Sequence, residues 1–251
     1  MAVNYELGAA AIMVAAMETV SASDLSGTTG CSDSATTLDV TAVDDFPDTG
    51  IVKIEDEYIL YLEKDDDTDE LKQCVRGIFG TAAAAHDTAK AVTYYASGLG
   101  KTFGGVTLSV NESSQDLKTD QDGETPVDSR ITGTVVELVA NLTDIKLENF
   151  ALAYKQSITT LADGVSGRRL AVKPNVGYST QSNAYVTHVF PYSGGTTTID
   201  EEIEHQYTLP SAGVVAASEL SFDATTQRVV KTTFKGFPDS ASEVLICGKP
   251  F

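Results

Sequence analysis

The sequence predicts a mainly β protein, built as a β-sandwich or barrel with one flanking α-helix and a small inserted β domain. Three observations predict this: short segments of alternating apolar and polar residues between turn signals, a single helical apolar stripe, and a shift in composition between about residues 31 and 96. The 251 residues suit one large β domain, or one domain that carries an insertion.

The first predicted strand is the apolar run Leu7–Met17. A signal peptide would require basic residues in front of this run, but Glu6 stands there and no Lys or Arg precedes it. The run is also shorter than the ~20 apolar residues of a membrane helix. We therefore expect a buried strand, in a chain that is made without export and does not enter a membrane.

A small β domain is predicted at residues 31–96, inserted into a core domain formed by residues 1–30 and 97–251. Between its strand-like pieces, Lys64–Glu70 (KDDDTDE) is too charged to be buried and should form an exposed hairpin tip. The flanks are rich in Gly and Ser, as expected of linkers at a domain insertion. We expect the insert to lie on the outer surface. Its five strand-like pieces are Thr37–Val43, Ile51–Ile54, Tyr58–Leu62, Leu71–Val75 and Lys90–Tyr95.

The core domain continues with strands that alternate clearly. A turn is predicted at Gly104-Gly105, and a short apolar strand at Val244–Cys247 closes the chain after the turn at Phe237-Pro238-Asp239. In three predicted strands, every second residue is apolar or a threonine, so that these side chains share one face of the strand. These residues are Val106, Leu108 and Val110, then Val136, Leu138, Ala140 and Leu142, and later Val230, Thr232 and Phe234.

One helix is predicted after Thr143 and Asp144, which are both suitable N-cap residues. The apolar stripe Leu147, Phe150, Ala151 and Tyr154 has the spacing i, i+3, i+4 and i+7. We expect Leu147, Phe150 and Tyr154 to pack against the sheet. Residues 157–167 should form a loop that leads out of the helix.

The charge is strongly negative, with 17 basic and 36 acidic residues and a formal net charge of −19. Phosphate and anionic-lipid surfaces need an excess of Lys and Arg, which this chain lacks. A nucleic-acid-binding or membrane-surface protein is therefore not expected.

The string Ser97–Thr102 (SGLGKT) imitates the end of a phosphate-binding P-loop. The motif needs a glycine five positions before Gly100, where this chain has Tyr95, and it needs a helix after it. The residues that follow read as a strand instead. We interpret the string as a linker.

Two acidic turns resemble calcium loops without completing them. Asp65, Asp67 and Asp69 have suitable spacing, but Glu70 stands at the glycine position and Arg76 at the final glutamate position. The segment 120–123 fails similarly. Solvated acidic turns are the preferred interpretation, and weak cation binding at high calcium stays open.

The histidines and cysteines form no catalytic or metal-binding pattern. The histidines are far apart, and the acidic cluster around His205 favours a surface segment. Three cysteines at unrelated spacings favour reduced thiols, although a bridge between Cys31 and Cys74 stays open. We expect no enzyme, no cofactor and no metal. The histidines are His86, His188 and His205, and the third cysteine is Cys247.

Three parts of the chain resemble the tail tube (major tail) proteins of tailed bacteriophages. In residues 103–154 the resemblance lies in FGGVTLSV, DQDGETPVD, ITGTVV and LENFALA, and near the end in VVKTTFKGFPD and ICGKP. The opening VNYELGAAAIMV also fits, so that most of 1–25 and 97–251 is covered. Residues 49–92 resemble a small β module of phage virion proteins, through GIVKIEDEYILY and CVRGIFGTAAAAH. Tail tube proteins without insertions lack this module.

The resemblance implies a structural virion protein with a tail-tube-like β-sandwich core. It implies hexameric rings that stack into a tube, assembly in the host cytoplasm, and a final location in the virion tail. The implied partners are other copies of the chain, a tape-measure protein, a tail terminator and tail-tip or baseplate proteins, while DNA passes through without specific binding. The alternatives are a tail-tip or adaptor protein with a host-surface-binding module, and an enzyme or small-ligand binder.

The segment Asn111–Arg130 lies between two strongly alternating strands and has only Leu117 and Val127 as apolar residues. It cannot build a core of its own, so we predict a long hairpin connection that is mobile in the free monomer. The resemblance implies an arm that reaches the neighbouring ring, and a loose solvent-exposed loop is the alternative. The residues to which this assembly role is assigned are Asp120, Asp122, Glu124, Pro126 and Asp128.

Overall fold

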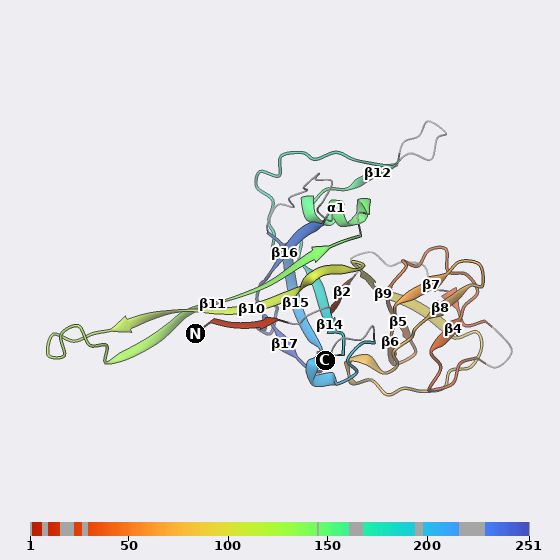
Figure 1. Ribbon diagram of the computed structural model, residues 1–251, viewed down its shortest axis with the longest axis horizontal. Helices are drawn as coiled ribbons and strands as arrows, with labels where there is room; N and C mark the ends of the chain where they lie inside the picture. The colour runs from red at the N-terminus through yellow and green to blue at the C-terminus, as the bar shows by residue number, and fades with distance from the viewer. Residues whose placement is uncertain are drawn as a thin grey trace.

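The computed structural model describes residues 2–6, 10–15, 23–26, 30–144, 146–160, 168–193, 198–215 and 229–250. These residues are mainly β and contain one α-helix, so the predicted fold class is confirmed (Figure 1). The strands are β1 Ala2–Glu6, β2 Ala10–Ala15, β3 Ser23–Asp24, β4 Thr37–Asp39, β5 Gly50–Ile54, β6 Glu57–Tyr61, β7 Glu63–Asp65, β8 Glu70–Lys72, β9 Ala91–Gly98, β10 Thr102–Leu117, β11 Asp128–Leu142, β12 Ile158–Thr160, β13 Arg168–Leu170, β14 Tyr185–Pro191, β15 Tyr207–Val214, β16 Val230–Gly236 and β17 Ile246–Cys247. The helices are α1 Leu147–Tyr154 and the 3₁₀ turns η1 Ile78–Gly80 and η2 Ile203–His205.

The main sheet is antiparallel and runs in the order β1-β10-β11-β16-β15-β14-β2-β9-β5-β6. The predicted alternation explains its core, because the apolar side chains of β10, β11 and β16 point to one face and are buried there. Leu108, Leu138 and Phe234 are fully buried on that face. Helix α1 contributes Ala153 to the same core, as the packing of the helix over the sheet in Figure 1 indicates.

Strands β3 to β9 form a small β-barrel, and we call it the small barrel. β9 pairs with β5, β5 with β6, β7 with β8, and β8 with β4, and the bridge between Leu60 and Val75 links β6 to the segment that follows β8. The bridge between Leu25 and Val40 leads from β4 back to β3, which pairs with β9. Its own core includes Leu38, Ile59 and Tyr61, which are fully buried.

Strand β9 joins the small barrel to the rest of the main sheet. It pairs with β5 of the small barrel and, over Ala96–Gly98, with β2 of the main sheet. An apolar cluster that contains Met13 and Phe190 from the main sheet and Phe79 from the small barrel fills the junction. The small barrel includes β3 at Ser23–Asp24, and residues 96–98 of the Gly- and Ser-rich flank belong to strand β9.

Two glycines let the chain pass very close to its neighbours at this junction. A Cβ atom on Gly98 would lie 1.9 Å from the Thr49 hydroxyl, and one on Gly100 would lie 2.1 Å from the Asp144 carboxylate. Gly100 also has a φ of +87°, which side chains disfavour. The P-loop-like segment Ser97–Thr102 is thus a tightly packed connection between β9 and β10, and the chain continues in strand β10 rather than in a helix.

Helix α1 begins at Leu147, later than the predicted caps allow. The Thr143 hydroxyl donates a hydrogen bond to the Lys101 carbonyl instead of capping the helix. Asn149 is buried, because its amide donates hydrogen bonds to the carbonyls of Leu99 (3.0 Å) and Asp144 (2.8 Å).

Because these hydrogen bonds bury Asn149, the buried face of α1 is shifted by about one residue from the predicted apolar stripe. The fully buried residues are Asn149 and Ala153, and Phe150 packs half-buried against the core. Leu147 and Tyr154 are half-buried, and the Tyr154 ring stacks on Phe150 at 6.2 Å between centroids. Periodicity alone misses this arrangement, since it treats an asparagine as a solvent-facing residue.

Phe150→Ala should lower the free energy of unfolding by about 2 kcal/mol, below the usual cost for a fully buried phenylalanine because the ring is half-buried. Urea denaturation followed by circular dichroism measures this loss. Phe150→Leu, which keeps most of the apolar contact, should recover more than half of it. Equal stability of the alanine variant and wild type would mean that α1 does not depend on this contact.

Two further local expectations differ from the structure. Gly104 and Gly105 have φ values of 78° and 83° and form a bulge inside β10 rather than a turn before it. Residues 158–160 form β12 instead of a loop, while residues 161–167 lie outside the described part of the chain. The predicted strand Leu7–Met17 is β2 over Ala10–Ala15, and its remaining residues also lie outside that part.

Candidate assembly interface

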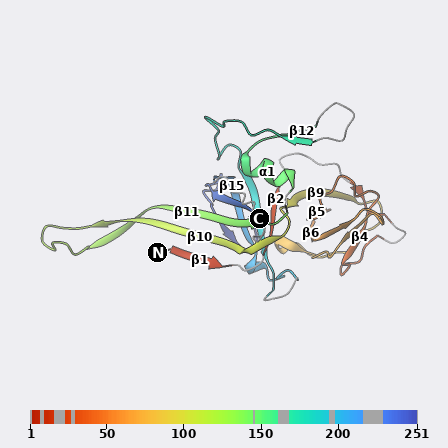
Figure 2. The same ribbon diagram turned by 45° about the horizontal axis from the view of Figure 1, so that its top comes forward.

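The long strands β10 and β11 form a hairpin that projects far beyond the body of the protein (Figures 1 and 2). Their pairing runs from Thr102 opposite Leu142 to Leu117 opposite Asp128. Only the inner half has further neighbours, because β1 pairs with β10 up to Asn111 and β16 pairs with β11 from Glu137. We call the unsupported outer part, Glu112–Thr134, the arm.

The arm has no buried face. All of its residues are exposed except Leu117, which is half-buried. The sequence causes this, since the apolar alternation stops at Val110 on one strand and begins only at Val136 on the other. A two-stranded hairpin on its own is at best marginally stable in water, and its two open edges can pair with other strands.

A β-bulge lies within the arm. Ser113 pairs with Gly133 and Ser114 with Ile131, so that Thr132 is an extra residue on β11. The Thr132 hydroxyl donates a hydrogen bond to the Ser113 carbonyl (3.1 Å). Bulges of this kind increase strand twist and redirect a hairpin.

The structure brings the five predicted arm residues together at the tip of the arm, where all five are exposed. The tip is closed by the Val127 amide, which donates to the Leu117 carbonyl at 2.9 Å. Glu124 forms an ion pair with Lys118 at 2.5 Å. The five residues are Asp120, Asp122, Glu124, Pro126 and Asp128.

Two of these carboxylates are available to a partner. Asp122 accepts a hydrogen bond from the Thr119 hydroxyl, and Asp128 accepts one from the adjacent Ser129 amide at 2.8 Å. Asp120 makes no hydrogen bond or ion pair within the described residues. Asp120, together with the largely open Asp128, can therefore meet a cationic or hydrogen-bond-donating surface at low cost.

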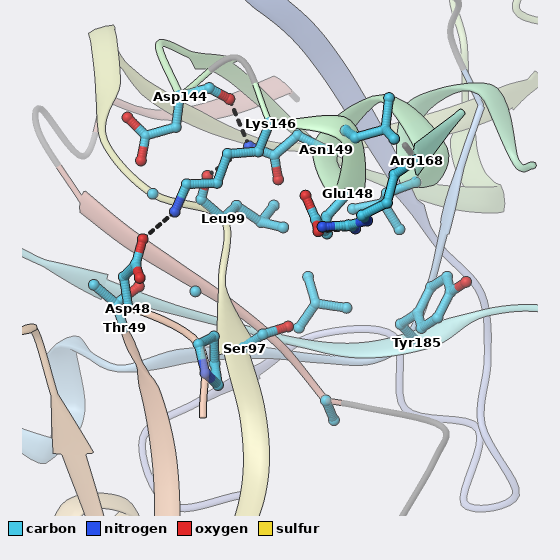
Figure 3. Close-up of a pocket in the computed structure, with 17 residues that line it drawn as sticks. Asp48, Thr49, Ser97, Leu99, Asp144, Lys146, Glu148, Asn149, Arg168 and Tyr185 are labelled. Carbon is cyan, nitrogen blue, oxygen red and sulfur yellow. Dashed lines mark hydrogen bonds and ion pairs between the residues drawn. The ribbon is translucent and has the colours of Figure 1, made fainter. Parts of the chain in front are cut away.

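A cleft lies where the small barrel meets α1 (Figure 3). It consists of two adjoining pockets of 630 and 550 Å³. The Lys146 ammonium forms an ion pair with Asp48 between them. Residues shared by both pockets are Asp48, Thr49, Gly98, Gly100, Asp144 and Lys146, and we call this feature the junction cleft.

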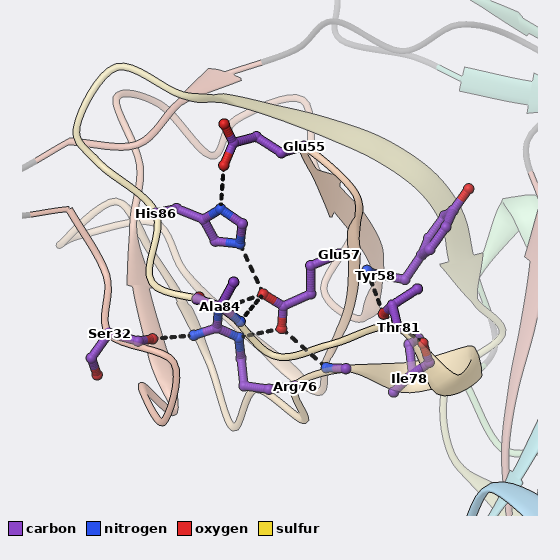
Figure 4. A network of polar contacts seen from close by, with 10 residues as sticks. Ser32, Glu55, Glu57, Tyr58, Arg76, Ile78, Thr81, Ala84 and His86 are labelled. Carbon is purple, nitrogen blue, oxygen red and sulfur yellow. Dashed lines mark hydrogen bonds and ion pairs between the residues drawn. The ribbon is translucent and has the colours of Figure 1, made fainter.

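A buried polar network that sequence reasoning missed lies in the small barrel (Figure 4). The Glu57 carboxylate is 1% exposed and accepts hydrogen bonds from Arg76 at 2.8 and 2.7 Å. His86 lies within 2.8 Å of both Glu57 and Glu55. The backbone amides of Gly77 and Ala84 also donate to Glu57.

Burial alone would raise the pKa of Glu57, but the hydrogen bonds from Arg76 and His86 outweigh it and hold that pKa below its usual value of 4.5. Glu57 is therefore an ionised carboxylate with five donors around it. The network ties the loop of residues 76–86 to strand β6. No spacing rule would have found it, since Glu57 and His86 are separated by 29 residues.

The other two histidines have separate structural roles. His188 is buried beside Phe79, with 4.5 Å between ring centroids, and its Nδ1 lies 2.9 Å from the Thr208 hydroxyl. Burial lowers the pKa of His188 to about 3, so the ring is neutral. His205 lies on the surface, 2.7 Å from Asp200.

Within the described ranges, no group of three or more His, Cys, Asp or Glu side chains could hold a metal ion. Cys31 and Cys74 are buried free thiols, and Cys247 is an exposed one. Burial raises the pKa of the Cys74 thiol to about 12.

None of the helices in the described part of the chain is both long and apolar enough to cross a membrane. No protein-family model and no curated protein matches the chain at a significant level.

Proposed function

We propose that the chain is a structural subunit that assembles with copies of itself into stacked rings, forming the tail tube of a tailed bacteriophage. The arm is the observation that carries this proposal. Its strands have polar side chains on both faces and open edges on both sides, so a partner is needed to stabilise it. Repeated copies of one subunit supply such a partner at every position of a tube.

The likeness of residues 103–154 to tail tube proteins supports this assignment, because the same segment forms β10, the arm, β11 and α1. The net charge of −19 supports a role in DNA passage rather than DNA binding, since an acidic subunit repels phosphates. In this proposal the other partners are a tape-measure protein, a tail terminator and tail-tip or baseplate proteins. The subunit is assembled in the host cytoplasm and ends in the virion tail.

Negative-stain electron microscopy of the purified full-length chain tests the proposal. We expect hollow tubes or stacks of hexameric rings that lengthen with protein concentration. Isolated rings would favour the alternative of a tail-tip or adaptor protein. Monomers at all concentrations and salt levels, with a folded circular dichroism spectrum, would contradict self-assembly.

A further inference from the structure

The His86 ring in the small barrel lies between two carboxylates (Figure 4). Its Nδ1 is 2.8 Å from an oxygen of Glu55, and its Nε2 is 2.8 Å from an oxygen of Glu57. The side chain of His86 is only 2% exposed. Both ring nitrogens therefore depend on the protein, rather than on water, for their hydrogen bonds.

Both carboxylates are ionised at neutral pH. Glu57 is ionised because its donors outweigh its burial. Hydrogen bonds from Lys90, at 2.6 Å, and from His86 hold the pKa of Glu55 below its usual value of 4.5. An ionised carboxylate accepts hydrogen bonds and cannot donate one. Each ring nitrogen of His86 must therefore supply the proton of its own contact, whereas a neutral imidazole has only one such proton.

The contrast with His188 shows that burial alone does not decide the charge of a histidine in this protein. His188 is also buried, but its Nδ1 faces the Thr208 hydroxyl, which can donate or accept. Burial lowers the pKa of His188 to about 3, so that ring is neutral. At His86 the two carboxylates favour the charged ring instead.

The charged and titratable groups around His86 come from several parts of the chain. Among them, the two carboxylates lie at hydrogen-bond distance from the ring nitrogens, while the cations are bound to those carboxylates. The groups are Glu55 from the two-residue turn between β5 and β6, Glu57 from β6, Arg76 from the segment after β8, Lys90 and Asp87 from the segment before β9, and the thiol of Cys31, whose backbone pairs with that of His86.

We propose that His86 is a doubly protonated, positively charged ring that clasps the β5–β6 turn to residues 86–90, and that the clasp opens when the ring loses a proton. After that loss, one ring nitrogen would face a carboxylate with a lone pair, and two acceptors 2.8 Å apart repel each other. Glu55 is the carboxylate that moves away, because its side chain is 46% exposed. Glu57 stays, since it is buried and has four other donors.

The clasp lies next to the connection between the two parts of the fold. Residues 86–90 lead directly into β9, the strand that joins the small barrel to the rest of the main sheet. The charged ring therefore stiffens the small barrel close to its attachment. This inference does not depend on self-assembly, because every group of the clasp belongs to one chain.

Nitrogen-15 NMR of the histidine rings tests the protonation state directly. At pH 6 we expect both nitrogens of His86 to carry a proton, while His188 shows the single proton of a neutral ring. The variant His86→Gln identifies the signals of His86 by their disappearance. A neutral His86 ring at pH 6 would overturn the proposal.

Amide hydrogen exchange, corrected for the intrinsic effect of pH, tests the opening. The bound proton stabilises the closed clasp at low pH, and this stabilisation is lost as the pH rises. From pH 6 to pH 8, residues 84–90 should lose protection by about fivefold or more, whereas strand β16, Val230–Gly236, should keep its protection. Equal protection of residues 84–90 at both pH values would contradict the clasp.

Glu55→Gln gives the matched variant at an exposed position, where the fold is not at risk. A glutamine amide can either donate to Nδ1 or accept from it, so the contact survives in both protonation states of the ring. The change in protection between pH 6 and pH 8 should therefore disappear. His205→Gln is the control, because it removes the surface pair with Asp200 and should leave the change as in wild type. A pH effect that Glu55→Gln leaves undiminished would overturn the role of Glu55.

Discussion

Tubes should be absent when Asp120 and Asp128 are both replaced by lysine, while the subunit stays folded. Both side chains are exposed at the tip of the arm, and neither supports the main core or that of the small barrel. The change reverses the charge of the surface that we expect to face the next subunit. Polar contacts between subunits are individually weak, but a symmetric ring repeats them in every subunit, so that together they are strong. Reversing two charges per subunit therefore removes many contacts at once.

Electron microscopy and sedimentation of assembled protein measure this loss, and circular dichroism verifies the fold. Asp56→Lys with Asp67→Lys is a matched control, because it changes the net charge equally, from −19 to −15, at exposed positions of the small barrel. The control variant should assemble. Normal tubes from the arm variant at wild-type concentration would contradict the assembly role of the arm. Assembly of the wild-type protein should also depend on salt concentration, since the contacts involve exposed charges.

Glu57→Ala should cause the largest loss of stability among single substitutions in the small barrel. It would leave Arg76, His86 and two backbone amides without their shared acceptor in a site that water barely reaches. Removing one partner of a buried ion pair typically costs about 3 to 5 kcal/mol. Thermal unfolding monitored by circular dichroism measures the loss. Glu55→Ala is the matched control, because Glu55 also contacts His86 but is exposed, and this variant should melt close to wild type.

The same carboxylate makes stability depend on pH. Its native pKa is held below 4.5, so ionised Glu57 stabilises the fold above that pH, and this contribution is lost as the pH falls through the native pKa. The difference in stability between wild type and Glu57→Gln should therefore narrow as the pH is lowered below 4.5. A difference that stays constant from pH 7 to pH 3 would mean that Glu57 does not titrate with unfolding.

The sequence predicts the parts of the fold that depend on burial. The alternation of Val106, Leu108 and Val110 identifies the inner half of β10, because one face of that strand lies against the core. The continuation of β10 to Leu117 has no such signal. There the strand is held by backbone hydrogen bonds to β11, which leave no pattern in the side chains.

The arm could be predicted as a projection, and its tip residues as a group, because a long polar segment between two buried strands must extend into solvent. The junction cleft and the network around Glu57 could not. Both are formed by residues far apart in the chain, such as Asp48 and Lys146, which meet only because β9 joins the small barrel to the main sheet.

The sharing of β9 has a mechanical consequence. A domain attached by flexible linkers swings freely, and a pull on it is lost in the movement of the linkers. Here a pull on the small barrel passes through the hydrogen bonds of β9 directly into β2 and the main sheet. A force on the small barrel is therefore transmitted through β9 to the main sheet, and from there to the arm, which continues β10 and β11 of that sheet.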